Sequence, residues 1–257
     1  MTISVTYGVE GHVAHIHFAK PPYNYACPQL LGQIADCLEK ADADADVRCS
    51  VLSSEGKAFC AGADLAGDDS ITSGDGMVSI GQLYVQAERI FRRAKPMVAA
   101  VQGGAIGAGL GLAVAADFRV ADPTTRLSAN FVRLGFHPGF ALTCTLPRLL
   151  GQQRASWMML SAERVKPDAA LAWGLVDRIA EPGQSLADAM AMAREIADNA
   201  PLALVAVRRT LNDGLGDAVA AAMRHEHAQQ TALKGTQDYA EGVASVFDRR
   251  PARFKGR

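Results

Sequence analysis

A glycine-rich turn between Lys95 and Asp117 contains the residues best suited to hold a reacting group through the backbone. The run Met97–Val101 before the turn is short and valine-rich, which predicts a buried strand. Leu110–Ala116 after it is aliphatic on every side, which predicts a buried helix. The glycines of the turn are Gly103, Gly104, Gly107, Gly109 and Gly111. Because glycine permits close approach and a first helical turn has unpaired N–H donors, we expect backbone N–H groups to meet a ligand here.

The order of these glycines disfavours two common phosphate-binding turns. No Lys-Ser or Lys-Thr pair follows them, as a nucleoside-triphosphate loop requires. Gly104, Gly107 and Gly109 do not have the GxGxxG order, which disfavours a nucleotide-dependent dehydrogenase. No charged side chain in the turn compensates a phosphate. The expected ligand atom is therefore a neutral group or a developing anion, such as a thioester oxygen, and a plain packing turn is the alternative.

A second loop of small residues repeats this arrangement. Ser54–Asp64 is rich in alanine and glycine and directly follows Val47–Ser53, a predicted strand. Two such turns can place two N–H donors around one oxygen atom, which is the geometry of an oxyanion hole. The sequence therefore predicts that the two loops serve one site.

A third loop, Asn130–Phe140, contributes aromatic side chains and one histidine where a pocket wall is expected. His137 is the side chain there whose unperturbed pKa lies near neutrality. We expect it either to act as a general acid, a general base or a hydrogen-bond donor, or to be fixed structurally by the turn Phe136–Pro138.

Other reactive side chains near the predicted pocket are acids and thiols: Asp64, Asp68, Asp69, Cys60 and Cys144. Asp64 is expected to support its own loop, and Cys60 lacks an evident partner base for nucleophilic chemistry. His15 and His17 stand two apart on a predicted strand. Since no third ligand is nearby, a polar strand face is expected there rather than a metal site.

The elements that position these loops alternate between strand and helix patterns, so we expect an α/β fold. Ile3–Tyr7 and Val13–Phe18 predict a hairpin at the start of the chain. Glu181–Gly183 is the clearest boundary, because four helical patterns and no strand pattern follow it. The predicted domains are residues 1–183, a core that carries the ligand site, and residues 184–257, a helical region for assembly.

Composition excludes several classes of protein. The chain has 257 residues, of which 49% are apolar and 21% charged, and its net charge is −1, which argues against nucleic-acid or membrane-surface binding. No uninterrupted apolar run reaches the roughly 18 residues of a membrane span, and Met1–Ser4 leads into a strand pattern instead of a signal peptide. The five cysteines are scattered without zinc or disulfide spacing, so a reducing cytoplasm is expected.

Four stretches, in this order, resemble the crotonase (enoyl-CoA hydratase/isomerase) superfamily. They are Gly56–Leu65, Lys95–Gly103 with the glycines after it, Ala172–Val176 and Glu241–Phe254. The resemblance covers nearly the whole chain. It implies a crotonase-like spiral of ββα units with a C-terminal helical trimerisation region, and assembly as a homotrimer or a dimer of trimers.

The resemblance also implies an acyl-CoA ligand whose thioester carbonyl lies between the backbone N–H groups of Ala63 and Ala108. Coenzyme A would be part of the substrate, and no other cofactor is implied. Ala61, Asp64 and Leu65 would border the CoA arm.

Near the end of the chain, Arg249 matches a basic position that approaches CoA phosphate from a neighbouring subunit. Val246 stands where an aromatic residue is usual, with Phe247 beside it.

The chain departs from the family pattern at the acid/base positions. Hydratases of the family use two glutamates, and these positions hold Gly111 and Phe131; a third acidic position, used by some isomerases, holds Gly139. Hydration needs a proton-transfer group and an oriented water. Phe131 and Phe136 are expected to narrow the pocket and exclude water, which favours isomerisation or decarboxylation. The alternative is a catalytically silent acyl-CoA binder or assembly subunit.

Overall fold

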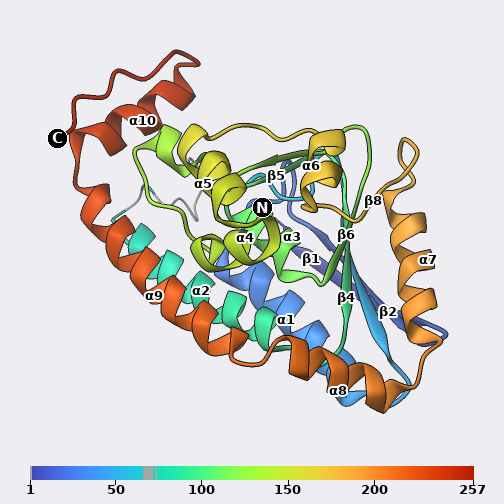
Figure 1. The fold of residues 1–257 in the computed structure, drawn as a ribbon. Coiled ribbons are helices and arrows are strands. Elements are labelled where there is room, and N and C mark those ends of the chain that lie inside the picture. The colour runs from blue at the N-terminus through green and yellow to red at the C-terminus, as the bar shows by residue number, and fades with distance from the viewer. Residues whose placement is uncertain (1, 66–71, 73) are drawn as a thin grey trace.

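Figure 1 shows the computed structural model of the protein, which describes residues 2–65, 72 and 74–257. Its strands are β1 (Ser4–Glu10), β2 (Val13–Ala19), β3 (Cys49–Ser54), β4 (Met97–Val101), β5 (Gly104–Ile106), β6 (Phe118–Ala121), β7 (Arg126–Ser128) and β8 (Arg178–Ile179). The helices up to the predicted boundary are α1 (Pro28–Ala43), α2 (Gly76–Arg92), α3 (Ala108–Ala115), the 3-10 helix η1 (Asn130–Leu134), α4 (Leu142–Leu150), α5 (Gln152–Ser161) and α6 (Pro167–Trp173). Beyond it lie α7 (Ser185–Ala197), α8 (Pro201–Leu211), α9 (Leu215–Lys234) and α10 (Gln237–Phe247).

The main sheet has the order β1-β2-β3-β4-β6-β8. β1 and β2 are antiparallel, and every later pair in this sheet is parallel. β4 is apolar and buried at all of its positions, as expected for a parallel strand covered on both faces. α7 packs on one face of the sheet, and α1 and α2 lie on the other (Figure 1).

Most predicted elements are confirmed, and two differences concern the site. The hairpin of β1 and β2 is present, and β4 has the predicted bounds. The glycine turn, however, contains the strand β5, which pairs with β7 in a second, two-stranded sheet. The loop after β7 begins with the 3-10 helix η1, which the sequence pattern did not indicate.

The four helices after residue 183 make separate contacts with the rest of the chain. α9 lies along α2, and α10 packs on η1 (Figure 1). The division of the chain at residue 183 stays a prediction. Among the described helices, none is both long and apolar enough to cross a membrane.

Candidate functional site

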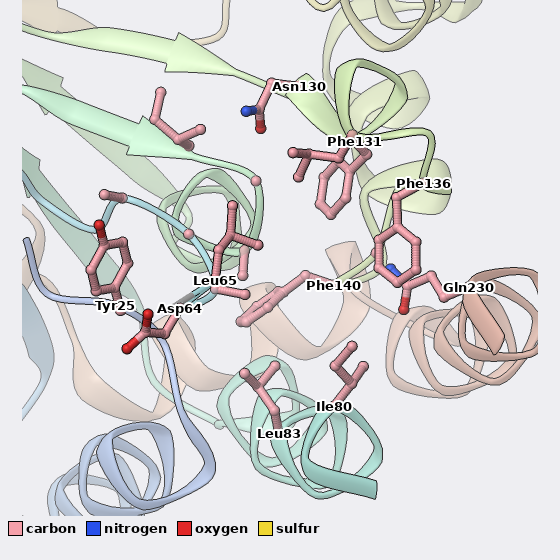
Figure 2. A pocket seen from close by; sticks show the side chains of 18 of the residues that line it. Tyr25, Asp64, Leu65, Ile80, Leu83, Asn130, Phe131, Phe136, Phe140 and Gln230 are labelled. Atoms are coloured by element: carbon pink, nitrogen blue, oxygen red, sulfur yellow. The ribbon is translucent and has the colours of Figure 1, made fainter. Parts of the chain in front are cut away.

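A cavity of about 380 Å³ lies between the two small-residue loops, the η1 loop and the helices α2, α9 and α10. The loop after β3 contributes Ala61, Ala63, Asp64 and Leu65 to the lining of the cavity. The glycine turn contributes Ile106, Gly107 and Ala108. Figure 2 shows the aromatic wall formed by Phe131, Phe136 and Phe140. The sequence-predicted cavity residues Ala61, Ala63, Asp64, Leu65, Ala108, Phe131 and Phe136 all lie in this lining.

Backbone hydrogen bonds hold the two small-residue loops together. The Cys60 N–H donates to the Gly104 carbonyl at 3.0 Å, and the Ile106 N–H donates to the Cys60 carbonyl at 3.0 Å. A Cβ atom on Gly109 would lie 1.9 Å from the Cys60 oxygen, so only glycine permits this approach. The two loops, which are far apart in the sequence, are therefore joined by direct main-chain hydrogen bonds.

The glycine turn leads directly into the first turn of α3. Gly107 has φ +55°, donates its N–H to the Ser128 carbonyl at 2.8 Å and is the N-cap residue of α3. Ala108 is consequently the first helical residue, where an N–H has no intrahelical acceptor. Within the described part of the chain, no acceptor is paired with the N–H of Ala108 or of Ala63. The cavity is thus bordered by two residues with unpaired backbone donors.

Neighbouring side chains fill the space beside Gly111 and Gly139, two of the positions where the resemblance predicts carboxylates. A Cβ atom on Gly111 would lie 2.5 Å from ring carbons of Phe140. One on Gly139 would lie 1.9 Å from the hydroxyl oxygen of Tyr84. Phe131 stands at the other glutamate position and lines the cavity. An acidic side chain therefore has no room at either glycine unless its neighbours move.

Asp64 is the one carboxylate among the described residues that line the cavity, and it is 5% exposed. Tyr25 lies on the same side of the cavity (Figure 2). Burial raises the pKa of the Tyr25 hydroxyl, and the charge of Asp64 raises it further. Tyr25 is therefore a hydrogen-bond donor at neutral pH and not a base.

The sequence-predicted histidine lies outside this lining. The His137 Nδ1 atom is 2.7 Å from the Pro138 carbonyl oxygen, and the ring lies 6.1 Å from the ring of His225. The structure therefore places His137 in the turn beside the cavity and not among the residues that border it.

The thiols do not line the cavity either. Burial raises the pKa of Cys60 to about 11, and burial also raises the pKa of Cys144, so both thiols are protonated at neutral pH. Asp68 and Asp69 lie outside the described residues.

His15 and His17 share a hydrogen-bonded partner on the neighbouring strand. Their ring nitrogens lie 2.7 and 2.9 Å from the Ser53 hydroxyl oxygen. No group of metal-ligating side chains is found in the described ranges. The shared Ser53 partner makes this part of the sheet polar.

The C-terminal helix α10 closes one side of the cavity of its own chain. Val246 and Phe247 line the cavity, whereas Arg249 does not. The role of Arg249 toward CoA phosphate stays a prediction.

Sequence reasoning missed several lining residues that come from distant elements, chiefly Tyr25, Tyr84 and Gln230. Gln230 lies on α9 and is 1% exposed. Glu226, one helical turn earlier on α9, is 0% exposed. Two polar residues spaced four apart on an otherwise apolar helix face are a signal that could have been recognised in the sequence.

Comparisons with known proteins agree with one another. The family model described as Enoyl-CoA hydratase/isomerase matches residues 8–257. A putative enoyl-CoA hydratase of Thermus thermophilus is 34% identical over 252 residues, which are 95% of this chain and 98% of that protein. The 1,2-epoxyphenylacetyl-CoA isomerase of Escherichia coli is 29% identical over 234 residues, or 89% of each chain.

A solved structure shows the same fold. The crystal structure of an enoyl-CoA hydratase/isomerase from Pseudoalteromonas atlantica superposes with a TM-score of 0.85 at 27% identity, and it covers 98% of this chain and 100% of that one. The predicted fold class, an α/β crotonase-like spiral, is confirmed by this likeness.

Proposed function

Because the chain belongs to the enoyl-CoA hydratase/isomerase family, we propose that it binds an acyl-CoA thioester and stabilises the enolate of that thioester. The observation that supports this most directly is the pair Ala63 and Ala108, which line one cavity with unpaired N–H groups. The thioester carbonyl oxygen would accept a hydrogen bond from each. When a bond at the α-carbon breaks, its electron pair moves onto that oxygen, and each donor contributes about 3 kcal/mol to stabilising the charge.

We propose a reaction other than hydration. Hydration needs a group that transfers protons and a water held against the double bond. Phe131, Phe140 and the Tyr84 hydroxyl occupy or border the places where the family's carboxylates would stand. Decarboxylation of a thioester with a carboxylate on its α-carbon, as in a malonyl thioester, needs no base, because CO2 leaves and the electron pair of the broken C–C bond forms the enolate. Isomerisation requires a proton carrier, and Asp64 is the carboxylate that lines the cavity among the described residues.

The test removes one N–H donor. Ala108→Pro eliminates the N–H at the first position of α3, where proline is compatible with a helix. We expect turnover of a β,γ-enoyl-CoA or a malonyl-type thioester to fall by about 10²–10³-fold. Gln152→Pro is the matched control, because Gln152 is the exposed first residue of α5 and lies outside the cavity. Unchanged turnover in Ala108→Pro would contradict the oxyanion-hole role.

A second candidate function is an acyl-CoA binder without turnover. It is favoured by the filled acid positions, since Phe140 and Tyr84 leave no space for a catalytic side chain at Gly111 or Gly139. Titration calorimetry with butyryl-CoA and a substrate panel of crotonyl-CoA, a β,γ-enoyl-CoA and a malonyl-type thioester separate the two. Binding without turnover of any member supports the silent binder, and the absence of binding contradicts both candidates.

The assembly proposed for the chain is a homotrimer or a dimer of trimers. Exposed apolar side chains on α8 support an interface there: Leu202 is 85% exposed and Leu211 is 72% exposed. Sedimentation velocity that shows a monomer at micromolar concentration would contradict this proposal.

A further inference from the structure

Two buried polar residues of α9 hold the loop that forms the inner wall of the cavity. Glu226 and Gln230 are 0% and 1% exposed, and they lie one helical turn apart. The loop in front of them, here residues 137–143, leads from η1 into the first turn of α4 and includes Gly139 and Phe140 of the cavity lining. A buried carboxylate and a buried amide are unusual in a helix face unless specific partners satisfy them.

The carboxylate of Glu226 receives three hydrogen bonds from the loop. The backbone N–H groups of Ala141 and Thr143 donate to it at 2.8 and 3.0 Å, and the Thr143 hydroxyl donates at 2.6 Å. No lysine or arginine of the described chain forms an ion pair with it. The hydrogen-bond donors to Glu226 are therefore two backbone N–H groups and one hydroxyl.

The amide of Gln230 joins the same loop to α2. Its Nε2 donates to the His137 carbonyl at 3.0 Å, and its Oε1 accepts from the Tyr84 hydroxyl at 2.9 Å. Figure 2 shows Gln230 beside Phe136 at the edge of the cavity. The loop is thus bound at both ends, by Gln230 at His137 and by Glu226 at Thr143.

Between these anchors the backbone takes an unusual path. Phe140 and Ala141 have φ angles of +61° and +57°, in the left-handed region that residues with side chains rarely adopt. Two consecutive residues in this region persist only where their surroundings fix them. This path directs the ring of Phe140 toward Gly111, where it fills the space of the missing carboxylate.

We infer that Glu226 and Gln230 are positioning residues that keep the Phe140 ring in the cavity and so restrict the site to short acyl groups. The inference deepens the proposed function and rests on it. Glu226 does not line the cavity and acts through the loop, whereas Gln230 holds the loop and also lines the cavity. If the anchors are weakened, the loop relaxes toward ordinary backbone angles, Phe140 leaves Gly111, and the cavity becomes longer.

The experiment compares the dissociation constants of butyryl-, octanoyl- and palmitoyl-CoA. Glu226→Gln replaces one acceptor oxygen by an amino group that faces the N–H donors of Ala141 or Thr143. We expect the preference for butyryl-CoA over octanoyl-CoA to fall by roughly tenfold. Phe140→Ala should lower it at least as much, and the double variant should show no further change beyond Phe140→Ala, because both substitutions remove the same ring.

Asp177→Asn is the control for loss of stability alone. Asp177 accepts a hydrogen bond from the Arg119 N–H at 2.7 Å and does not line the cavity. It should lower the melting temperature without altering the butyryl-to-octanoyl ratio. If Glu226→Gln does not fold, Thr143→Val removes the hydroxyl that donates to Glu226 at 2.6 Å without altering the cavity lining, and it is expected to change the ratio in the same direction.

The outcomes separate this inference from the proposed function. An unchanged ratio in a folded anchor variant overturns the inference while acyl-CoA binding by the wild type still supports the function. If the wild type binds none of the three thioesters, the proposed function fails. A crystal structure of Glu226→Gln then decides the positioning role: displacement of the Phe140 ring from Gly111 supports it, and an unmoved ring overturns it.

Discussion

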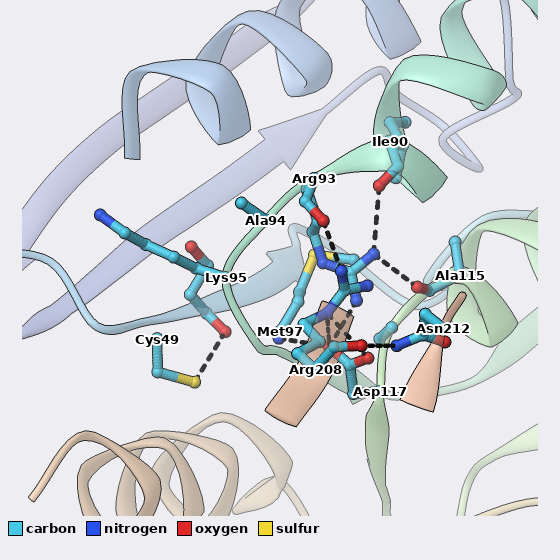
Figure 3. Close-up of polar contacts among 12 residues, drawn as sticks. Cys49, Ile90, Arg93, Ala94, Lys95, Met97, Ala115, Asp117, Arg208 and Asn212 are labelled. Atoms are coloured by element: carbon cyan, nitrogen blue, oxygen red, sulfur yellow. Dashed lines mark hydrogen bonds and ion pairs between the residues drawn. The ribbon is translucent and has the colours of Figure 1, made fainter. Parts of the chain in front are cut away.

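Asp117 and Glu226 are both largely buried carboxylates, and each joins a helix of the C-terminal region to the rest of the chain. Asp117 accepts hydrogen bonds from Arg93 at 2.6 Å, from Arg208 of α8 at 3.1 Å and from the Met97 N–H at 2.8 Å (Figure 3). Glu226 of α9 has neutral donors in place of arginines. One helix is therefore attached through compensated charge and the other through backbone hydrogen bonds.

The two environments move the carboxyl pKa values in opposite directions. Burial alone would raise the pKa of Asp117, but the guanidinium groups of Arg93 and Arg208 outweigh it and the pKa is lowered. Burial raises the pKa of Glu226, and its hydrogen bonds only partly offset that effect. The ion pairs of Asp117 with two arginines stabilise the fold as a whole. The hydrogen bonds of Glu226 with neutral donors instead hold the backbone of the cavity loop in one particular path.

The largest effect expected from this contrast follows Asp117→Asn. The substitution leaves Arg93, whose side chain is 1% exposed, and Arg208 without their negative partner. We expect the free energy of unfolding, measured by urea denaturation at pH 7, to fall by about 3–5 kcal/mol. The preference among acyl-CoA chain lengths should stay that of the wild type.

Asp217→Asn serves as the matched control for that substitution. Asp217 pairs with Arg92 at the surface and is 85% exposed. Its loss is expected to cost less than about 1 kcal/mol. If both variants lost the same free energy of unfolding, the buried ion pairs of Asp117 would stabilise the protein no more than the exposed pair of Asp217.

The next largest effect concerns the wall that Glu226 supports. In Gly111→Glu the new Cβ would overlap the Phe140 ring, so we expect the free energy of unfolding to fall by about 1–3 kcal/mol. Adding Phe140→Ala provides room for the carboxylate, and the two losses should then be less than additive in denaturation experiments. Strict additivity would show that the ring of Phe140 does not occupy this space.

This overlap also bears on how hydration could be restored. Phe131→Glu and Gly111→Glu supply the two family glutamates, but the ring of Phe140 occupies the space beside Gly111. A gain of crotonyl-CoA hydration is therefore expected only when Phe140→Ala accompanies them. A gain without it would mean that the cavity loop yields to the new side chain.

The sequence predicted those parts of the site that depend on local pattern. The strand β4 and the small-residue turns around Ala63 and Ala108 were predictable, because the residues that determine their structure lie within a few positions of them. β5 escaped prediction because three residues show no periodicity, and the strand exists through pairing with β7 and contact with Cys60.

The cavity wall escaped prediction for a related reason. Tyr84 and Gln230 are 146 positions apart and meet only because α9 packs along α2. The left-handed angles of Phe140 depend on hydrogen bonds from the loop to Glu226, 85 positions after Ala141. The family pattern showed that the carboxylates at Gly111 and Gly139 are absent, but only the packing shows that their space is filled.

The smallest expected effect, and the one that sharpens the contrast most, is the pH dependence of stability. The lowered pKa of Asp117 gives stability that is present above 3.8, the ordinary pKa of an aspartate, and is lost as the pH falls through the native pKa. The raised pKa of Glu226 gives stability that is present below 4.5, the ordinary pKa of a glutamate, and is lost as the pH rises through the native pKa. The two carboxylates therefore stabilise the fold on opposite sides of the acid range.

Urea denaturation of the wild type and both variants across this pH range therefore separates the two carboxylates. The destabilisation caused by Asp117→Asn should shrink as the pH falls from 3.8 through the lower native pKa of Asp117, below which the wild-type carboxylate is protonated as well. The destabilisation caused by Glu226→Gln should instead shrink as the pH rises above 4.5, because only the wild type has a charge to bury there. Parallel pH profiles for the two variants would mean that the neutral donors around Glu226 stabilise its charge as well as two arginines stabilise that of Asp117.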